Sequence, residues 1–326
     1  MSKTNLLSVL FFCCAFTTKA QTDTVRGKQD PVVVTANKYE QKQSTTGKVV
    51  TVISKEQLIK SNGKTLSQVL NEQAGLVING SLNNYGSVQT VYMRGAASGR
   101  TLILLDGIPV NDPSMINNEF DLNLFSLDNV DRIEICKGAQ STLYGSDAIA
   151  GVINIITANA DSKKALNLKA SLSGGNLGTF KANTQVYGKK GKFNYAARYT
   201  RLSTNGFSAA YDSTGNKGYD KDEYKGNMAN AQVKFQATDH LSFRSFLMYS
   251  QYKAAIDAGV FADEKDYNIN NDNLSTGAGF NFKQDFLTLA GTYQYSQVNR
   301  TYLNDSNFKT STIFEDNQYF WKNPVC

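Results

Sequence analysis

The spacing of apolar residues along the chain changes near residue 160. Before that point, short apolar runs alternate with helix signals. Beyond residue 161, apolar and polar residues alternate with a period of two, which places the apolar side chains on one face of a β-strand. Seven such strands are predicted, at residues 166–172, 180–188, 193–202, 228–237, 241–252, 274–283 and 287–296. In the fourth, the apolar face carries Ala229, Ala231, Val233, Phe235 and Ala237, and the polar face carries Asn230, Gln232, Lys234 and Gln236.

Residues 46–160 are predicted to form a separate, small α/β domain. Ser54 with Gln57, and Thr65 with Gln68, have the spacing of capping boxes, so a short helix is expected after each. The apolar runs between and after these helices predict a compact core of short strands. These strands are expected at residues 49–53, 76–78, 88–93, 101–105, 133–135 and 152–156.

The connections between the alternating strands have two different lengths. Residues 188–192, 238–240 and 283–285 are tight turns, whereas residues 203–227, 253–273 and 299–311 are long and polar. Short turns at one end and long loops at the other are typical of an outer-membrane β-barrel, whose apolar face contacts lipid. A soluble β-sandwich also alternates, but seven consecutive strands favour the barrel.

The N-terminus supports export from the cytoplasm. Residues 1–20 combine a lysine, an apolar run at 6–16 and small residues before Gln21, which is the pattern of a secretory signal peptide. The apolar run is shorter than the roughly 20 residues that a membrane-spanning helix needs. A lipoprotein anchor at Cys13 or Cys14 is the alternative interpretation. Residues 21–45 are predicted to be a flexible arm, which contains an unexpected β-branched run at 30–36.

Composition and charge narrow the function. No proline occurs from residue 114 to residue 323, which suits continuous sheet because proline cannot donate to a β-ladder. Removing the signal peptide removes two lysines and lowers the formal charge from +6 to +4. No basic stripe for nucleic acid remains, and no arrangement of a nucleophile with a base, or of metal ligands on a helix, indicates an enzyme. Cys136 is expected to be an ordinary core residue.

A small domain before a large barrel has a physical explanation. A barrel of about 22 strands has a lumen wide enough to need a plug. The predicted inner wall is polar, so we expect the plug to keep its own hydrophobic core while the strands turn their apolar face to lipid. The fold class is therefore an α/β plug followed by a transmembrane antiparallel β-barrel. The chain is expected to hold about the first third of the strands, in residues 161–326.

Four stretches resemble a known family. The run "DPVVVTA" at residues 30–36 resembles the TonB box. The runs "VYMRG", "TLILLDGIPV" and "RIEICKGAQSTLYGSDAIAGVINIIT" resemble the plug signatures of TonB-dependent outer-membrane receptors. Ala139 departs from the proline that is usual in the family, and Cys136 replaces a bulkier aliphatic residue.

The resemblance implies energy-coupled import. Asp30, Pro31, Val32, Val33, Val34, Thr35 and Ala36 would form the TonB box, to which the periplasmic protein TonB adds a strand. By periodicity alone, the same run could equally be the first strand of the next domain. The resemblance also implies that Arg94, Arg132, Glu134 and Lys137 face the barrel wall as ion pairs.

Within the family, the order of motifs most resembles the cobalamin receptors. That likeness places two polar loops at the ligand, with Leu82, Asn83, Asn84, Tyr85, Met115, Ile116, Asn117 and Asn118 as the expected contacts. The loop from Tyr211 to Tyr224 carries Asp212, Asp220, Asp222 and Glu223, and cobalamin receptors use acidic loops to hold calcium. The alternatives are solvated loops without ligand or metal.

Three other functions remain open from the sequence. A ferric-siderophore receptor would share every motif above. A glycan importer of the SusC type would need an extra domain before residue 30. An adhesin or structural β-protein would not need the box-like arm.

Overall fold

The computed structural model describes residues 30–38, 41–87, 89–110, 112, 115, 122, 125–157, 164–215, 218–284, 287–304 and 308–322, the last range without side chains. By contacts, the chain divides into two units, residues 1–31 and 32–326. All the described helices and strands belong to the second unit. The predicted signal peptide at 1–20 lies outside the described residues.

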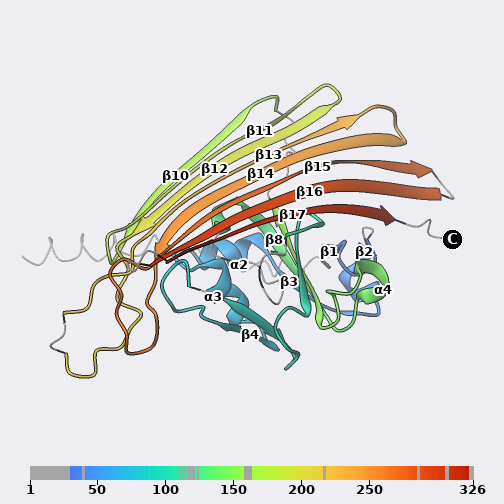
Figure 1. Cartoon of the computed structure of the whole chain (residues 1–326). Coiled ribbons are helices and arrows are strands. Elements are labelled where there is room, and N and C mark those ends of the chain that lie inside the picture. Colours follow the sequence, from blue (N-terminus) through green and yellow to red (C-terminus); the bar gives the residue numbers. More distant parts are fainter. Residues whose placement is uncertain are drawn as a thin grey trace, which may run out of the picture. The chain divides into compact units, whose positions relative to one another are not determined.

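A five-stranded mixed sheet forms the centre of the α/β domain, and two of its strands, β3 and β8, are labelled in Figure 1. The strand order is β3-β8-β9-β6-β7. Strand β6 runs parallel to β9, and the other neighbours are antiparallel. The strands are β3 (Val49–Ile53), β6 (Thr101–Leu105), β7 (Ile108–Pro109), β8 (Val130–Lys137) and β9 (Gly151–Thr157). The strands expected at 49–53, 101–105, 133–135 and 152–156 are therefore confirmed.

Two short helices begin at the predicted capping boxes. Ser54 caps α2 (Lys55–Lys60) and Thr65 caps α3 (Leu66–Asn71), each with the reciprocal glutamine contact. Their buried leucines and valine pack on the sheet, which stabilises helices too short to form alone. The four-residue helix α4 (Ser141–Tyr144) was not predicted, because one turn carries no periodic signal. Two 3-10 turns, η2 (Gln43–Thr45) and η4 (Leu127–Asn129), complete the described helical elements.

A separate hairpin pairs β4 (Leu76–Asn79) with β5 (Thr90–Met93), in antiparallel register. The loop between them holds the first set of expected ligand contacts. The two-residue strands β1 (Val32–Val33) and β2 (Gln41–Lys42) form another small sheet.

The two faces of the five-stranded sheet bury different clusters, because successive side chains point to opposite faces. Ile133, Ile135, Ile153 and Ile155 join the larger cluster with the helices. The other face holds a smaller cluster that contains Cys136, which is buried and reduced, as an ordinary core residue.

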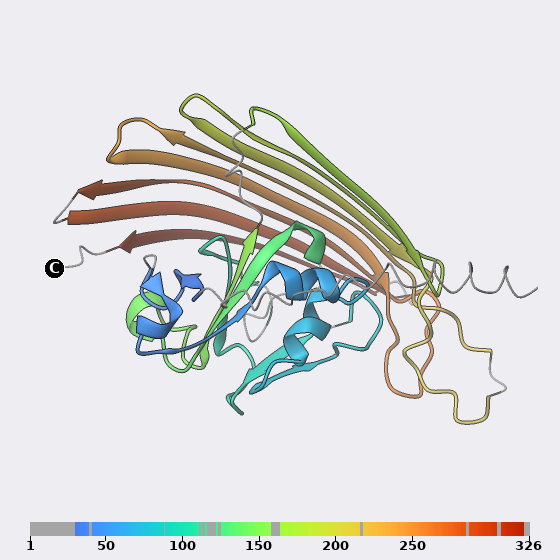
Figure 2. The same cartoon turned by 180° about the vertical axis from the view of Figure 1, so that it is seen from behind.

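The rest of the described chain is one antiparallel sheet of eight strands, each paired with the next in sequence (Figure 2). The strands are β10 (Asn167–Gly175), β11 (Thr179–Lys190), β12 (Phe193–Thr204), β13 (Tyr224–Gln236), β14 (Leu241–Ala255), β15 (Asn268–Gln284), β16 (Leu287–Asn304) and β17 (Phe308–Lys322). The seven predicted strands are confirmed, and β17 is an eighth. Within the described part of the chain, no helix is both long and apolar enough to cross a membrane.

The turns at one end of this sheet are short, as predicted. At the other end, β12–β13 and β14–β15 are joined by long loops, at residues 205–223 and 256–267. The predicted long loop at 299–311 is wrong, because β16 continues to Asn304 and β17 begins at Phe308. The polar ends of the strands lack the apolar alternation, so they resemble loop in the sequence.

The alternation of faces is confirmed by burial. Large apolar side chains are exposed on one face of the sheet, among them Leu168, Leu172, Val233, Phe243, Leu247 and Leu289. Polar side chains are buried on the other face, among them Asn183, Gln185, Thr200, Ser250, Asn271, Asn273 and Gln294. A polar face turned inward and an apolar face turned outward is the pattern of a transmembrane barrel wall.

The expectation of two separate cores is wrong. The larger cluster of the α/β domain continues into the sheet through Met228, Met248, Tyr252 and Ile269. The inward face of β14 is therefore not uniformly polar: Met248 lies on it and packs against the α/β domain, and the half-buried Phe246 lies on the same face.

Candidate functional site

Residues 32–36 of the box segment (residues 30–36) are packed into the α/β domain. Val33 is 0 % exposed and Ala36 is 1 % exposed, and both belong to the smaller apolar cluster. Val32 is 47 % exposed. Val32 and Val33 pair with Lys42 and Gln41 as a two-residue ladder. The segment is therefore anchored by buried apolar side chains, exposes the side chain of Val32, and forms only a two-residue β-ladder.

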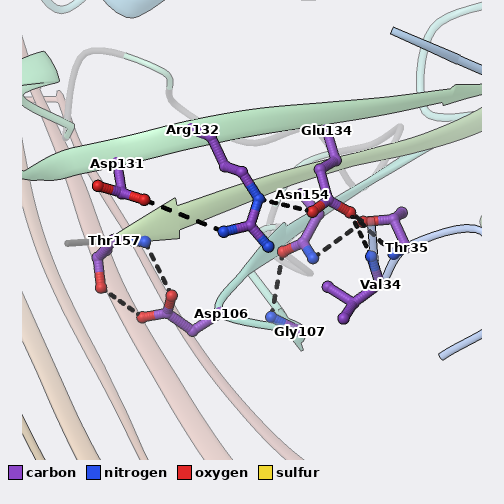
Figure 3. Close-up of polar contacts among 9 residues, drawn as sticks. All are labelled: Val34, Thr35, Asp106, Gly107, Asp131, Arg132, Glu134, Asn154 and Thr157. Atoms are coloured by element: carbon purple, nitrogen blue, oxygen red, sulfur yellow. Dashed lines mark hydrogen bonds and ion pairs between the residues drawn. The ribbon is translucent and has the colours of Figure 1, made fainter. Parts of the chain in front are cut away.

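A single carboxylate holds the middle of the segment (Figure 3). Oε2 of Glu134 accepts hydrogen bonds from the backbone N–H of Val34 and of Thr35, both at 2.9 Å, and from the Thr35 hydroxyl at 2.6 Å. The Glu134 side chain is 0 % exposed. Hydrogen bonds to a charged group each contribute roughly 1.5–3 kcal/mol, so Glu134 is the main polar contact of the segment.

Arg132 balances the charge of Glu134. Its Nε lies 2.9 Å from the other carboxylate oxygen, Oε1, and a second guanidinium nitrogen lies 4.0 Å from Asp131. A buried carboxylate needs such a partner, because desolvation without one is costly. Arg132 therefore leaves Oε2 free to serve the box segment.

Asn154 contacts the segment from the neighbouring strand. Its Nδ2 donates to the Thr35 hydroxyl at 3.0 Å, and its Oδ1 accepts from the Gly107 N–H at 3.1 Å. Glu134 and Asn154 are direct partners in the ladder between β8 and β9. The strand register thus places the two polar side chains next to each other on one face.

Two further groups hold the end of the segment by its carbonyls. The Tyr144 hydroxyl donates to the Thr35 carbonyl at 2.9 Å, and Lys48 donates to the Ala36 carbonyl at 2.5 Å. Burial raises the pKa of Tyr144, so its hydroxyl stays protonated and remains a donor. We call Glu134, Arg132, Asn154, Tyr144 and Lys48 the clasp.

Two residues that were expected to form ion pairs with the barrel wall, Glu134 and Lys137, have partners within the α/β domain. The sequence also did not indicate which residues hold the box segment. Glu134 was expected to pair with the barrel wall, but it binds the box segment and Arg132 instead. Lys137 donates to the Ala74 carbonyl within the α/β domain. The sequence does contain a signal for these residues: Glu134 lies between two isoleucines, and Asn154 interrupts an apolar strand. Polar residues in such positions are buried and need hydrogen-bond partners.

The first expected ligand loop is divided between exposed and buried residues. Leu82 is 76 % exposed and Asn83 is also exposed, whereas Asn84 is buried. Asn84 accepts from the Phe207 N–H at 3.1 Å and donates to the Phe207 carbonyl. The ring of Tyr85 lies 5.5 Å from that of Tyr224. Asn84 and Tyr85 therefore tie this loop to the sheet and its long loop.

The second expected ligand loop is described in part. Ile116, Asn117 and Asn118 lie outside the described residues. Met115 is half-buried, with its sulfur 2.7 Å from an Arg300 nitrogen. Arg300, from β16, also forms an ion pair with Asp112 at 2.7 Å, with both side chains less than a tenth exposed.

The two long loops of the sheet bring carboxylates together. Oxygens of Asp220, Asp257 and Asp263 lie within 4.8 Å of one another, an arrangement that could hold a metal ion. Of the four acidic residues expected to gather, Asp220 belongs to this group. Asp212 instead caps its own turn at Thr214.

Two more carboxylates of the first loop have other surroundings. Glu223 pairs with Lys225 at 2.8 Å. Asp222 is buried beside the acidic group, and burial with the nearby Asp257 and Asp220 raises its pKa to about 6. Oδ1 of Asp222 and Oδ1 of Asp220 are buried without a hydrogen-bond partner. An all-oxygen set with unsatisfied lone pairs fits a hard cation such as calcium.

Comparisons with known proteins agree with this architecture. Residues 42–152 match the family model of the TonB-dependent receptor plug domain. The vitamin B12 transporter BtuB of Vibrio cholerae serotype O1 is 36 % identical over 169 residues, which cover 52 % of this chain and 27 % of that protein. The vitamin B12 transporter BtuB of Photobacterium profundum is 27 % identical over 296 residues, covering 90 % of this chain and 47 % of that protein.

Solved structures share the fold at low identity. A ferric enterobactin receptor variant (PfeA) of Pseudomonas aeruginosa, in complex with enterobactin, matches with a TM-score of 0.64 and 17 % identity over 83 % of this chain and 46 % of that one. The siderophore receptor PirA of Acinetobacter baumannii matches with a TM-score of 0.64 and 18 % identity over 83 % and 44 %.

The matched proteins share a class of function and a cellular location. The chain spans from about a quarter to about half of the length of these two vitamin B12 transporters. The relatives are transporters and receptors rather than enzymes, and receptors of this kind are β-barrel proteins of the Gram-negative outer membrane. Residues 42–152 therefore match the TonB-dependent receptor plug domain, and the chain resembles TonB-dependent outer-membrane receptors, among which it is similar to the vitamin B12 transporters.

Proposed function

We propose that this chain belongs to a receptor that imports cobalamin across the outer membrane, with energy supplied through TonB. The observation that carries the proposal is the box segment, which is held by hydrogen bonds to the clasp and by the apolar anchor of Val33 and Ala36 rather than built into the five-stranded sheet. A segment held in this way can be stored in the plug and released without unfolding it. The likeness to vitamin B12 transporters supports cobalamin as the substrate.

The partner at the box segment is proposed to be TonB. Strand addition needs free main-chain donors and acceptors along an extended segment. In the clasp, Glu134 occupies the N–H groups of Val34 and Thr35, and Tyr144 occupies the Thr35 carbonyl. TonB therefore binds the segment only after the clasp opens.

The substrate is proposed to contact the two polar loops that the resemblance places at the ligand, residues 79–87 and 111–121, which we call the first and second apical loops. Leu82 and Asn83 are exposed at the tip of the first loop and offer an apolar and an amide group. Asn84, Tyr85 and Met115 are more buried, so they support the loops and reach the ligand less directly. Ile116, Asn117 and Asn118 remain proposed contacts from the sequence.

Calcium is proposed to bind the acidic group of the two long loops. Asp220, Asp257 and Asp263 supply the ligands, with Asp222 beside them. A bound cation would neutralise carboxylates that otherwise repel one another, and so would order both loops.

Ligand binding tests the substrate directly. The receptor in isolated outer membranes is titrated with radiolabelled cyanocobalamin, and in parallel with ferric enterobactin. Saturable cyanocobalamin binding that excess ferric enterobactin does not displace supports the proposal. Saturable binding of ferric enterobactin alone would instead make the protein a siderophore receptor.

A further inference from the structure

Asn154 is bonded to two parts of the plug that are far apart in the sequence. Its Nδ2 donates to the Thr35 hydroxyl in the box segment, at 3.0 Å. Its Oδ1 accepts from the N–H of Gly107, at 3.1 Å. The side chain is buried and comes from the middle of β9, so water does not substitute easily for either contact.

The Gly107 contact lies in a turn that leads to the second apical loop. Asp106 and Gly107 both have left-handed backbone conformations, with φ of 51° and 81°. They join β6 to β7, and the chain then continues into residues 111–121, which hold the second set of expected ligand contacts. The turn therefore lies only a few residues before that loop along the chain.

The turn is fixed at its other side to β9 and to the sheet of eight strands. The carboxylate of Asp106 accepts from the Thr157 N–H at 2.8 Å and from the Thr157 hydroxyl at 2.7 Å. Its backbone carbonyl accepts from Arg244 of β14, at 3.3 Å. The turn has fixed supports on both sides, and Asn154 is its contact with the box segment (Figure 3).

The orientation of the Asn154 amide follows from its partners. The Gly107 N–H can only donate, so Oδ1 faces it and Nδ2 faces Thr35. The Thr35 hydroxyl accepts from Nδ2 and donates its own proton to Glu134 at 2.6 Å. The three bonds form one chain from the turn to the carboxylate that holds the segment, and bonds in such a chain strengthen one another.

We infer that Asn154 is a positioning residue that couples the Asp106–Gly107 turn to the docking of the box segment. While the turn keeps its conformation, Asn154 orients the Thr35 hydroxyl toward Glu134. When the turn shifts, Asn154 follows Gly107 or loses it, and the segment is held less tightly in either case. The inference rests on the proposed function, because it names the contact through which the ligand-binding loops would influence the docking of the box segment.

The test measures release of the segment without any ligand. Val33→Cys places a thiol at a fully buried position of the segment, in a background with Cys136→Ser and Cys326→Ser. N-ethylmaleimide labelling of that peptide, followed by mass spectrometry on receptor in isolated outer membranes, reports how often the segment opens. Gly107→Ala perturbs the turn through its backbone alone, because a Cβ there meets no atom within 4 Å.

A double-mutant cycle then isolates the coupling. We expect Gly107→Ala to raise the labelling rate about fivefold or more when Asn154 is present. We expect Asn154→Leu to raise it by itself, and Gly107→Ala to add less than about twofold in that background. An equal factor in both backgrounds, or no effect of either substitution, would overturn the inference.

Two controls separate positioning from general loosening. Thr35→Val removes the hydroxyl, and with it both the Asn154 contact and the bond to Glu134, so it should raise labelling at least as much as Asn154→Leu and likewise abolish the effect of Gly107→Ala. Thr35→Ser keeps the hydroxyl and should preserve the coupling. Asn129→Ala removes another buried asparagine, which bonds to Thr200 of the sheet, and should change nothing. The labelling measurements are made without cobalamin, so they test the inference even if the receptor does not bind cobalamin.

Discussion

Glu134 is a buried carboxylate that uses one oxygen for an ion pair and the other for hydrogen bonds to the box segment. Its charge is neutralised by Arg132 through one oxygen, and its other oxygen accepts three hydrogen bonds from the box segment. Removing the charge would therefore weaken the segment without emptying the apolar cluster in which Val33 is anchored. This separates the polar part of docking from the hydrophobic part.

Glu134→Gln tests this division at the level of one residue. We expect the amides of Val34 and Thr35 to exchange with deuterium about 10–100-fold faster, because two charge-assisted bonds of roughly 1.5–3 kcal/mol each become weaker neutral ones. Hydrogen exchange with mass spectrometry of peptides covering residues 32–36 measures the rate. Asp131→Asn, which removes the ion pair with Lys55 at 3.0 Å and the longer contact with Arg132 at 4.0 Å but no bond to the segment, is the control and should leave these amides protected. Equal protection in Glu134→Gln and the unaltered protein would show that the carboxylate does not hold the segment.

The residues of this site were only partly accessible to sequence reasoning. The box segment was recognised from "DPVVVTA", by resemblance. Glu134 and Asn154 were not assigned to it, because they lie 99 and 119 residues from Thr35 in the sequence. Periodicity shows that a polar side chain interrupts a buried strand, but the identity of its partner depends on the tertiary fold.

At the scale of elements, the sequence predicted most helices and strands and misplaced their ends. Capping boxes locate α2 and α3, because the cap residues act on the backbone next to them. The ends of β15 and β16 were assigned to loops, because "NINNDN" and "QVNRTYLN" lack apolar alternation. Strand ends that extend beyond the lipid do not need alternating apolar residues, because their outer face does not contact acyl chains. The hydrophobic pattern therefore underestimates the length of these strands.

The two long loops carry a prediction about pH. In the absence of a cation, the raised pKa of Asp222, about 6, means that the folded loops hold a proton that an unfolded chain would release. Their stability therefore falls as pH rises from about 4 to about 6. A cation competes with that proton, so we expect calcium affinity to be constant above about pH 6.5 and to fall by up to about tenfold per pH unit below pH 6.

Isothermal titration of the receptor with calcium at about pH 7.5 and about pH 5 checks this dependence on the titration of Asp222. Asp257→Asn should weaken binding at the higher pH by at least about tenfold, since it removes a proposed ligand. Glu223→Gln, in the same loop region but paired with Lys225, should change it less than about twofold. Binding that is the same at both pH values, or equally weakened by both substitutions, would count against the acidic group as the calcium site.

At the scale of the molecule, the plug and the sheet share one hydrophobic cluster, which the sequence did not indicate. Met228, Met248 and Tyr252 extend the plug's apolar cluster into the sheet. The pair of Asp112 with Arg300 adds a buried ionic contact between an apical loop and β16. The interface is therefore partly hydrophobic, which a uniformly polar inner wall would exclude.

The buried pair gives a prediction about plug stability. Arg300→Met should destabilise the docked plug by about 3 kcal/mol, because it leaves Asp112 without the guanidinium at a desolvated site. Arg300→Met with Asp112→Leu should recover most of that loss, because a buried pair contributes little net stability relative to apolar replacements. The urea concentration at which plug amides lose exchange protection measures both effects. A double variant as unstable as the single one would mean that the interface depends on this pair specifically.

Transport in living cells tests the central claim most directly. Cells that express the receptor with Val33→Pro are compared with cells that express the unaltered receptor, for surface binding and for accumulation of radiolabelled cyanocobalamin. Proline removes a backbone donor needed for strand addition, so we predict unchanged binding and accumulation reduced to the level of cells without the receptor. Undiminished accumulation with Val33→Pro would contradict the account, because the box segment would then have no part in energy coupling.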